Sequence, residues 1–163
     1  MDSIEVELKV LVECLKKKER ALAQIASITE NQGLVLTSEL SHEEIYSFFM
    51  QMNVEKQDFI QLVMQCDQVF ESVFVKVGPV LDANPSKFGE QVKAMQDLIR
   101  LVMDLDVQIR VGEENNSNVL SQALVNVKAN LAGPPSDKPE SIDGGEYGSH
   151  KVIEAYKSQS KRR

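Results

Sequence analysis

Hydrophobic residues recur at alternating steps of four and three along the first thirty residues, and Lys18 is the one polar residue that interrupts them. This spacing places side chains on one face of a helix, as in a coiled coil. We expect a helix over about 4–31 that ends before Gly33. The run KKKER at 16–20 is expected on its solvated face, with Lys18 extending away from the apolar stripe. The stripe comprises Ile4, Leu8, Leu11, Leu15, Leu22 and Ile25.

A second, longer stripe follows Ser41, which has the spacing of a capping box with Glu44. Lys56 is its only polar residue. Gly78 and Pro79 disfavour a helix, so we expect this helix over about 42–77. The apolar positions are Ile45, Phe49, Met52, Phe59, Val63, Cys66, Phe70, Val73 and Val77.

The third stripe runs through the polar segment EENNSN at 113–118 without losing its phase. Asn84 is a suitable N-cap and Pro85 suits a first helical turn. Asn116 occupies a stripe position, and apolar residues resume at Leu120. We therefore expect one helix over about 85–131, weakened but unbroken at Gly112.

These elements predict an all-α fold, either a long antiparallel helical hairpin or a three-helix, coiled-coil-like bundle. The helical domain is expected to span 1–131. Residues 132–163 begin with a segment rich in proline and glycine and end with a basic segment, which predicts a flexible tail with a short helix at 150–158.

The expected helix lengths leave part of the third helix without a neighbour. A hairpin folded near residue 36 lets the first helix reach back only to about Val69, and the second helix ends near the level of Asn118. The residues beyond are expected to bind a partner helix, to close a homodimer, to contact the connector at 31–41, or to be covered by the chain's own tail through Val152, Ile153 and Tyr156. The predicted partner-binding residues are Asn116, Val119, Leu120, Ala123, Leu124, Val127 and Leu131.

Charge and composition restrict the function further. The formal net charge is −7 and the sequence pI is about 4.9, which disfavours nucleic-acid binding. No apolar run approaches the ~20 residues that cross a bilayer, and no signal-peptide pattern opens the chain. We expect a cytoplasmic protein without stable membrane insertion.

Candidate catalytic and metal-binding chemistry is sparse. Glu39 and His42 form a single E-x-x-H pair, whereas a di-metal bundle requires two such pairs and further carboxylates. Cys14 and Cys66 are expected to be small, buried or half-buried hydrophobic residues. No phosphate-binding loop or nucleophile motif occurs. We therefore expect neither an enzyme nor a bound metal or cofactor.

The chain resembles the FlgN family of flagellar type III export chaperones. The resemblance rests on LVECLKKKERALAQI at 11–25, DLIRLVMDLDVQIRVGEENNSNVL at 97–120 and the closing YKSQSKRR. It implies a cytoplasmic chaperone that holds the C-terminal helical segments of hook–filament junction proteins and prevents their premature association. It also implies delivery to the export gate or ATPase, with Tyr147 or Tyr156 as the contact. A structural coiled-coil homodimer and a FliT-like chaperone for the filament cap are the alternatives.

Overall fold

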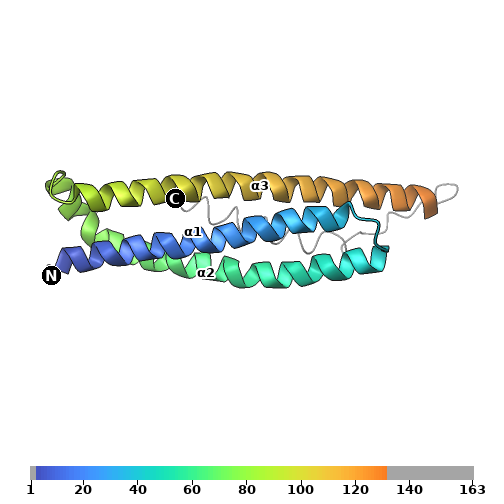
Figure 1. Ribbon diagram of the computed structural model, residues 1–163, viewed down its shortest axis with the longest axis horizontal. Coiled ribbons are helices and arrows are strands. Elements are labelled where there is room, and N and C mark those ends of the chain that lie inside the picture. The colour runs from blue at the N-terminus through green and yellow to red at the C-terminus, as the bar shows by residue number, and fades with distance from the viewer. Residues whose placement is uncertain (1–2, 132–163) are drawn as a thin grey trace. The chain divides into compact units, whose positions relative to one another are not determined.

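The computed structural model describes residues 3–131, and helices make up most of this part of the chain (Figure 1). The helices are α1 (Ser3–Leu36), α2 (His42–Ala83) and α3 (Gly89–Leu131). No strand occurs in residues 3–131. The predicted all-α helical bundle is therefore confirmed. The tail at 132–163, including the helix expected at 150–158, lies outside the described residues.

Contacts divide the chain into two compact units, each of which takes a part of every helix. Unit 1 comprises Met1–Ala26 and Asp58–Gln108, and unit 2 comprises Ser27–Gln57 and Ile109–Arg163. The 1–131 segment expected as one helical domain thus contributes to both units.

Unit 1 is organised around an apolar core that draws on all three helices and on the α2–α3 connection. Partly buried residues at the start of α1 and the end of α2, including Ile4 and Leu81, pack against this core. The expectation that the first helix reaches only to Val69 was therefore wrong. Two contacts between α1 and α2 show where the chain reverses direction. The sequence midpoint of Lys18 and Asp67, and that of Gln32 and Asn53, both lie between residues 42 and 43. The hairpin therefore folds about six residues after the expected position near residue 36. The core residues are Leu8, Leu11, Leu15, Val77, Phe88 and Met95.

Gly33 was predicted to end the first helix. Instead it lies inside α1, which continues to Leu36. A Cβ at this position would lie 2.9 Å from Oδ1 of Asn116. A Cβ at Gly112 of α3 would lie 2.8 Å from Cγ2 of Thr29. Both glycines therefore allow α1 and α3 to approach closely within unit 2.

The end of α2 also differs from its prediction. Pro79 lies inside α2, which continues to Ala83 instead of ending at Val77. Proline removes one backbone donor, but Val80 and Leu81 pack against the core of unit 1 and favour the last turn. The side-chain amide of Asn84 donates to the Val80 carbonyl at 3.2 Å, so Asn84 caps the end of α2 instead of starting α3.

Two predictions about helix starts and continuity are confirmed. The backbone N–H of Glu44 donates to Oγ of Ser41 at 3.2 Å, as the capping-box spacing predicts. The third helix is unbroken through Gly112 and the EENNSN segment. It begins at Gly89, because residues 85–88 form turns.

Replacing Gly112 with alanine should lower the free energy of unfolding by roughly 1 kcal/mol. Alanine favours a helix by about 1 kcal/mol over glycine, but relieving the overlap with Thr29 should cost about 1–3 kcal/mol. Urea unfolding monitored by far-UV circular dichroism would measure the difference.

Gly89→Ala is the matched control, because nothing lies within 4 Å of a Cβ at that position. It should be neutral or stabilising. Adding Thr29→Ser to Gly112→Ala removes Cγ2 while keeping the hydroxyl, and should restore stability. A Gly112→Ala protein more stable than the wild type would contradict the close approach of the two helices.

Candidate functional site

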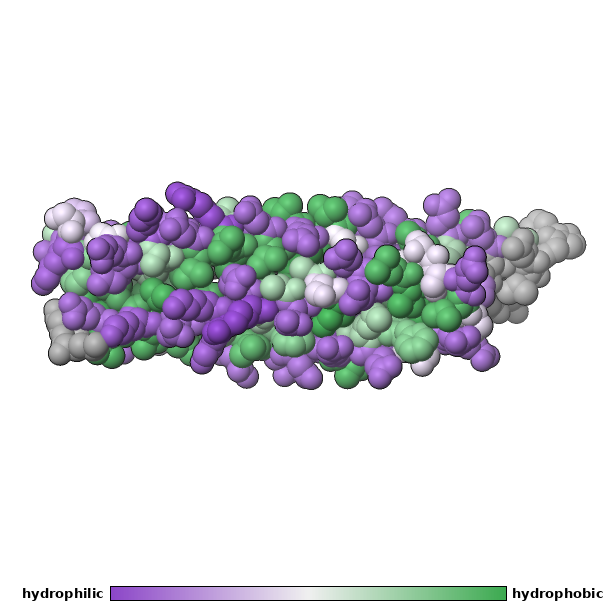
Figure 2. Space-filling model, in the orientation of Figure 1, coloured by the Kyte–Doolittle hydropathy of each residue, from purple (hydrophilic) through white to green (hydrophobic). Residues whose placement is uncertain are grey.

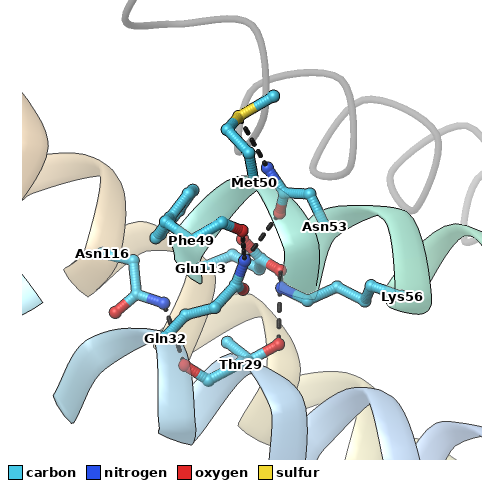
Figure 3. Close-up of polar contacts among 8 residues, drawn as sticks. All are labelled: Thr29, Gln32, Phe49, Met50, Asn53, Lys56, Glu113 and Asn116. Atoms are coloured by element: carbon cyan, nitrogen blue, oxygen red, sulfur yellow. Dashed lines mark hydrogen bonds and ion pairs between the residues drawn. The ribbon is translucent and has the colours of Figure 1, made fainter. Parts of the chain in front are cut away.

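Among the described residues, the interior of unit 2 contains six buried polar side chains, which we call the polar layer (Figure 3). Each helix contributes two of them, and none is more than 5% exposed. A buried polar group is costly unless it is hydrogen-bonded, so their contacts decide how stable this interior is. The layer consists of Thr29, Gln32, Asn53, Lys56, Glu113 and Asn116.

Lys56 and Glu113 form an ion pair at the centre of the layer. The ammonium group of Lys56 donates to Oε1 of Glu113, and the two side chains are 0% and 2% exposed. The hydroxyl of Thr29 also donates to Oε1 of Glu113, at 3.3 Å. This oxygen therefore connects all three helices.

Amide side chains extend the layer on either side of the ion pair. Nε2 of Gln32 donates to Oδ1 of Asn53 at 2.6 Å and to the backbone carbonyl of Phe49 at 3.2 Å. Nδ2 of Asn116 donates to the backbone carbonyl of Thr29 at 3.0 Å (Figure 3). These contacts join α1 to α2 and α1 to α3.

Two acceptors of the layer, Oε1 of Gln32 and Oε2 of Glu113, accept no hydrogen bond from a described protein group. A buried polar atom without a partner costs about 1–3 kcal/mol. Burial lowers the pKa of Lys56, although the Glu113 carboxylate opposes that shift. The layer thus holds charge and unpaired oxygens in a place where apolar packing would be more stable.

A second ion pair lies in unit 1. Nζ of Lys18 lies 2.6 Å from Oδ1 of Asp67, and Lys18 is only 4% exposed. The prediction that Lys18 extends into solvent was therefore wrong. Its ammonium group is held by a carboxylate from α2, which a pattern read within α1 alone does not reveal.

Cys14 and Cys66 are buried free cysteines of unit 1, as predicted. Burial raises the pKa of both thiols. A thiol with a raised pKa forms little thiolate at neutral pH and is a poor nucleophile. Their burial therefore favours a structural role over a nucleophilic one.

The residues predicted to bind a partner fall into three groups. Asn116 is buried in the polar layer and already donates to Thr29, so it does not lie on an accessible surface. Val119 and Ala123 are exposed, while Leu120 and Leu124 are half-buried. The side chains of Val127 and Leu131, and both Tyr147 and Tyr156, lie outside the described residues.

The four described apolar residues among them form what we call the α3-end surface, namely Val119, Leu120, Ala123 and Leu124. Within unit 2, α3 extends beyond the connector that joins α1 to α2 (Figure 1). The contact of Asn116 with Thr29 places the last turn of α1, which ends at Leu36, near the start of this surface. Farther along, the α3-end surface has no α1 segment beside it.

The contact of Lys56 with Glu113 places the start of α2, at His42, near the level of residue 127 of α3. The expectation that the second helix ends near the level of Asn118 was therefore wrong, and α2 runs alongside the α3-end surface.

Hydrophobic side chains also reach the surface elsewhere, in patches separated by hydrophilic ones (Figure 2). Val125 of α3 is 63% exposed. It lies about 100° around the helix from Leu124 and about 140° from Leu120, by the 3.6-residue period. The sequence prediction omitted it because it falls outside the apolar stripe.

The described residues contain no cluster suited to a metal ion. No group of three or more His, Cys, Asp or Glu side chains in residues 3–131 is arranged to hold one. Glu39 and His42 are both exposed. Across the same residues, no helix is both long enough and apolar enough to cross a membrane.

Comparison of the chain with known protein families, with characterised proteins and with solved structures found no match.

Lys56→Met should lower the free energy of unfolding by about 3–5 kcal/mol, because it leaves the Glu113 carboxylate buried without its cation. The double variant Lys56→Met/Glu113→Leu should recover most of this loss, or exceed the wild type, because an apolar pair needs no charge compensation. Urea unfolding would measure both variants.

Lys16→Met is the matched control. It removes an exposed ion pair in which Nζ lies 3.5 Å from Oε1 of Glu13, and such pairs contribute at most about 1 kcal/mol. A double variant no more stable than Lys56→Met alone would show that the loss comes from packing and not from the unpaired charge.

The stability of unit 1 should depend on pH through Asp67. Burial raises the pKa of this carboxyl from 3.8 to about 6, so the folded state binds the proton more tightly than the unfolded state does. The contribution of Asp67 to stability is therefore present below pH 4 and is lost as the pH rises to about 6. Because this side chain is 34% exposed, solvent screening should reduce the effect to roughly 1 kcal/mol.

Urea unfolding of the wild type and Asp67→Asn between pH 4 and pH 7 tests this dependence. The wild type should lose stability relative to the variant as the pH rises. If it instead gains stability, attraction to Lys18 outweighs burial and the carboxyl has a lowered pKa.

Proposed function

We propose that this protein is an export chaperone of the FlgN type, which binds the C-terminal helical segments of flagellar hook–filament junction proteins. In this proposal it acts in the cytoplasm, keeps these segments from associating prematurely, and delivers them to the type III export gate or ATPase. The resemblance of residues 11–25 and 97–120 to the family motivates the choice of client.

The α3-end surface is the observation that carries the proposal. Val119 is 38% exposed, and Leu120 and Leu124 are half-buried. An amphipathic helix that lies beside α3, past the level at which α1 ends at Leu36, would bury these side chains, in the manner of a helix bound in a groove. Full burial of a leucine contributes about 1.5–3 kcal/mol, so a few such contacts support specific binding.

Surface charge supports a protein partner over a nucleic acid. Most of the exposed charged residues described in unit 2 are acidic. Its described exposed lysines and arginines are Arg110 and Lys128. This balance repels a phosphate backbone. The acidic residues are Glu30, Glu39, Glu43, Glu44, Glu55 and Glu114.

The test is calorimetric titration of the full chain with C-terminal segments of junction proteins and of the filament cap. We expect one-to-one binding to a junction segment. Leu120→Asp combined with Leu124→Asp should weaken it at least about 100-fold, because each substitution places a charge in an apolar contact worth about 2 kcal/mol or more. Helical content by circular dichroism must stay unchanged.

Val125→Asp is the matched control, since it adds the same charge on another side of α3. It should leave the affinity within about threefold of the wild type. Binding of the cap segment alone would favour a FliT-like chaperone. A stable dimer in sedimentation that binds no segment would favour the structural coiled coil, with a second copy of this chain on the α3-end surface.

A further inference from the structure

The two units have interiors of different chemistry. Among the described residues, the buried hydrophobic side chains of unit 2 are Ile28, Phe49 and Ile109. Unit 1 holds all the others, and its apolar core joins the three helices. They are Leu8, Leu11, Cys14, Leu15, Ala21, Leu22, Ile25, Ala26, Ile60, Val63, Cys66, Val77, Phe88, Met95 and Val102.

Buried polar residues show the opposite distribution. Unit 2 contains the six residues of the polar layer, whereas the described buried polar residues of unit 1 are Lys18 and Asp106. Apolar burial stabilises a unit in proportion to the area removed from water. A buried ion pair contributes little or nothing net, because desolvation offsets the attraction between the charges.

We propose that unit 2 opens along its polar layer in the native protein, separating α3 from α1 and α2 there while unit 1 stays closed, and that this opening admits the partner helix. The purpose of the opening rests on the proposed chaperone function. The opening itself rests on the interior of unit 2 alone.

The unpaired atoms of the layer favour this motion. When the layer opens, water can donate freely to Oε1 of Gln32 and Oε2 of Glu113, to which no described protein group donates. Water also solvates the Lys56 ammonium and the Glu113 carboxylate, which offsets part of the hydrogen-bond energy lost. Few apolar contacts and a hydratable interior are the properties of a segment with low local stability.

The location of the layer connects the opening to binding. Glu113 and Asn116 precede the α3-end surface on the same helix, and Asn116 holds that helix to α1 through the Thr29 carbonyl. Release of these contacts would free a longer part of α3 than the four residues of the α3-end surface. A partner helix could then pack along α3 from about residue 113.

Hydrogen exchange on the full chain, without any partner, tests the opening. Backbone amides at 27–36 and 109–120 should exchange at least about tenfold faster than those at 8–15 and 95–105. Lys56→Met/Glu113→Leu should slow exchange in unit 2 about tenfold and leave unit 1 unchanged, because the methionine and leucine, unlike the two charged groups they replace, gain nothing from water on opening.

Lys18→Met/Asp67→Leu is the matched control, since it replaces the ion pair of unit 1 with the same two residues, methionine and leucine, that the test variant introduces in unit 2. It should not slow exchange at 27–36 or 109–120. Equal exchange rates in the two units, or no slowing in the Lys56→Met/Glu113→Leu variant, would overturn the proposal.

A binding experiment separates this inference from the proposed function. If unit 2 exchanges quickly but no junction segment binds, the opening stands and the chaperone function fails. If a segment binds the wild type, the Lys56→Met/Glu113→Leu variant should associate with it about tenfold more slowly in stopped-flow measurements. Unchanged association would show that the partner binds only to the closed α3-end surface, and would overturn the role given to the opening.

Discussion

The ion pair between Lys56 and Glu113 fixes the register of the three helices in unit 2. Both side chains are almost completely buried, and a charge in such a place is tolerated only when its partner and the surrounding hydrogen bonds are in position. Glu113 is held by Lys56 from α2 and by the Thr29 hydroxyl from α1. Its carboxylate therefore requires all three helices in one register, and a shift of any helix would separate these groups.

The glycines of α1 and α3 make this register possible. The amide of Asn116 reaches the Thr29 carbonyl only where the two backbones lie close together, and side chains at Gly33 or Gly112 would oppose that approach. The same close contact places Thr29 beside Glu113. Two residues that favour helix termination in an isolated sequence thus act here as packing sites, and the polar layer depends on their missing side chains.

The local periodicity of the sequence was sufficient to predict the helices and most of their apolar positions. The long third helix followed from the preserved phase across EENNSN, and the start of α2 followed from Ser41 and Glu44. What could not be predicted were features that depend on a second helix. Lys18 and Lys56 were visible as polar residues in apolar stripes, but their carboxylates lie 49 and 57 residues away. Gly33 and Pro79 were assigned to helix ends because nothing within α1 or α2 reveals the neighbour that favours continuation.

The candidate site was predicted only in part for the same reason. The α3-end surface follows from helix lengths, which a single sequence reveals approximately, whereas the polar layer requires the pairing of residues on different helices. Asn116 illustrates this. Its position in the apolar stripe led to its prediction as a partner-binding residue, but its hydrogen bond to the Thr29 carbonyl places it in the interior of unit 2. Apolar side chains of unit 2 thus remain partly exposed at the end of α3 while polar ones occupy its interior. This distribution is opposite to that of a stable core and is suited to a unit whose packing is completed by another helix.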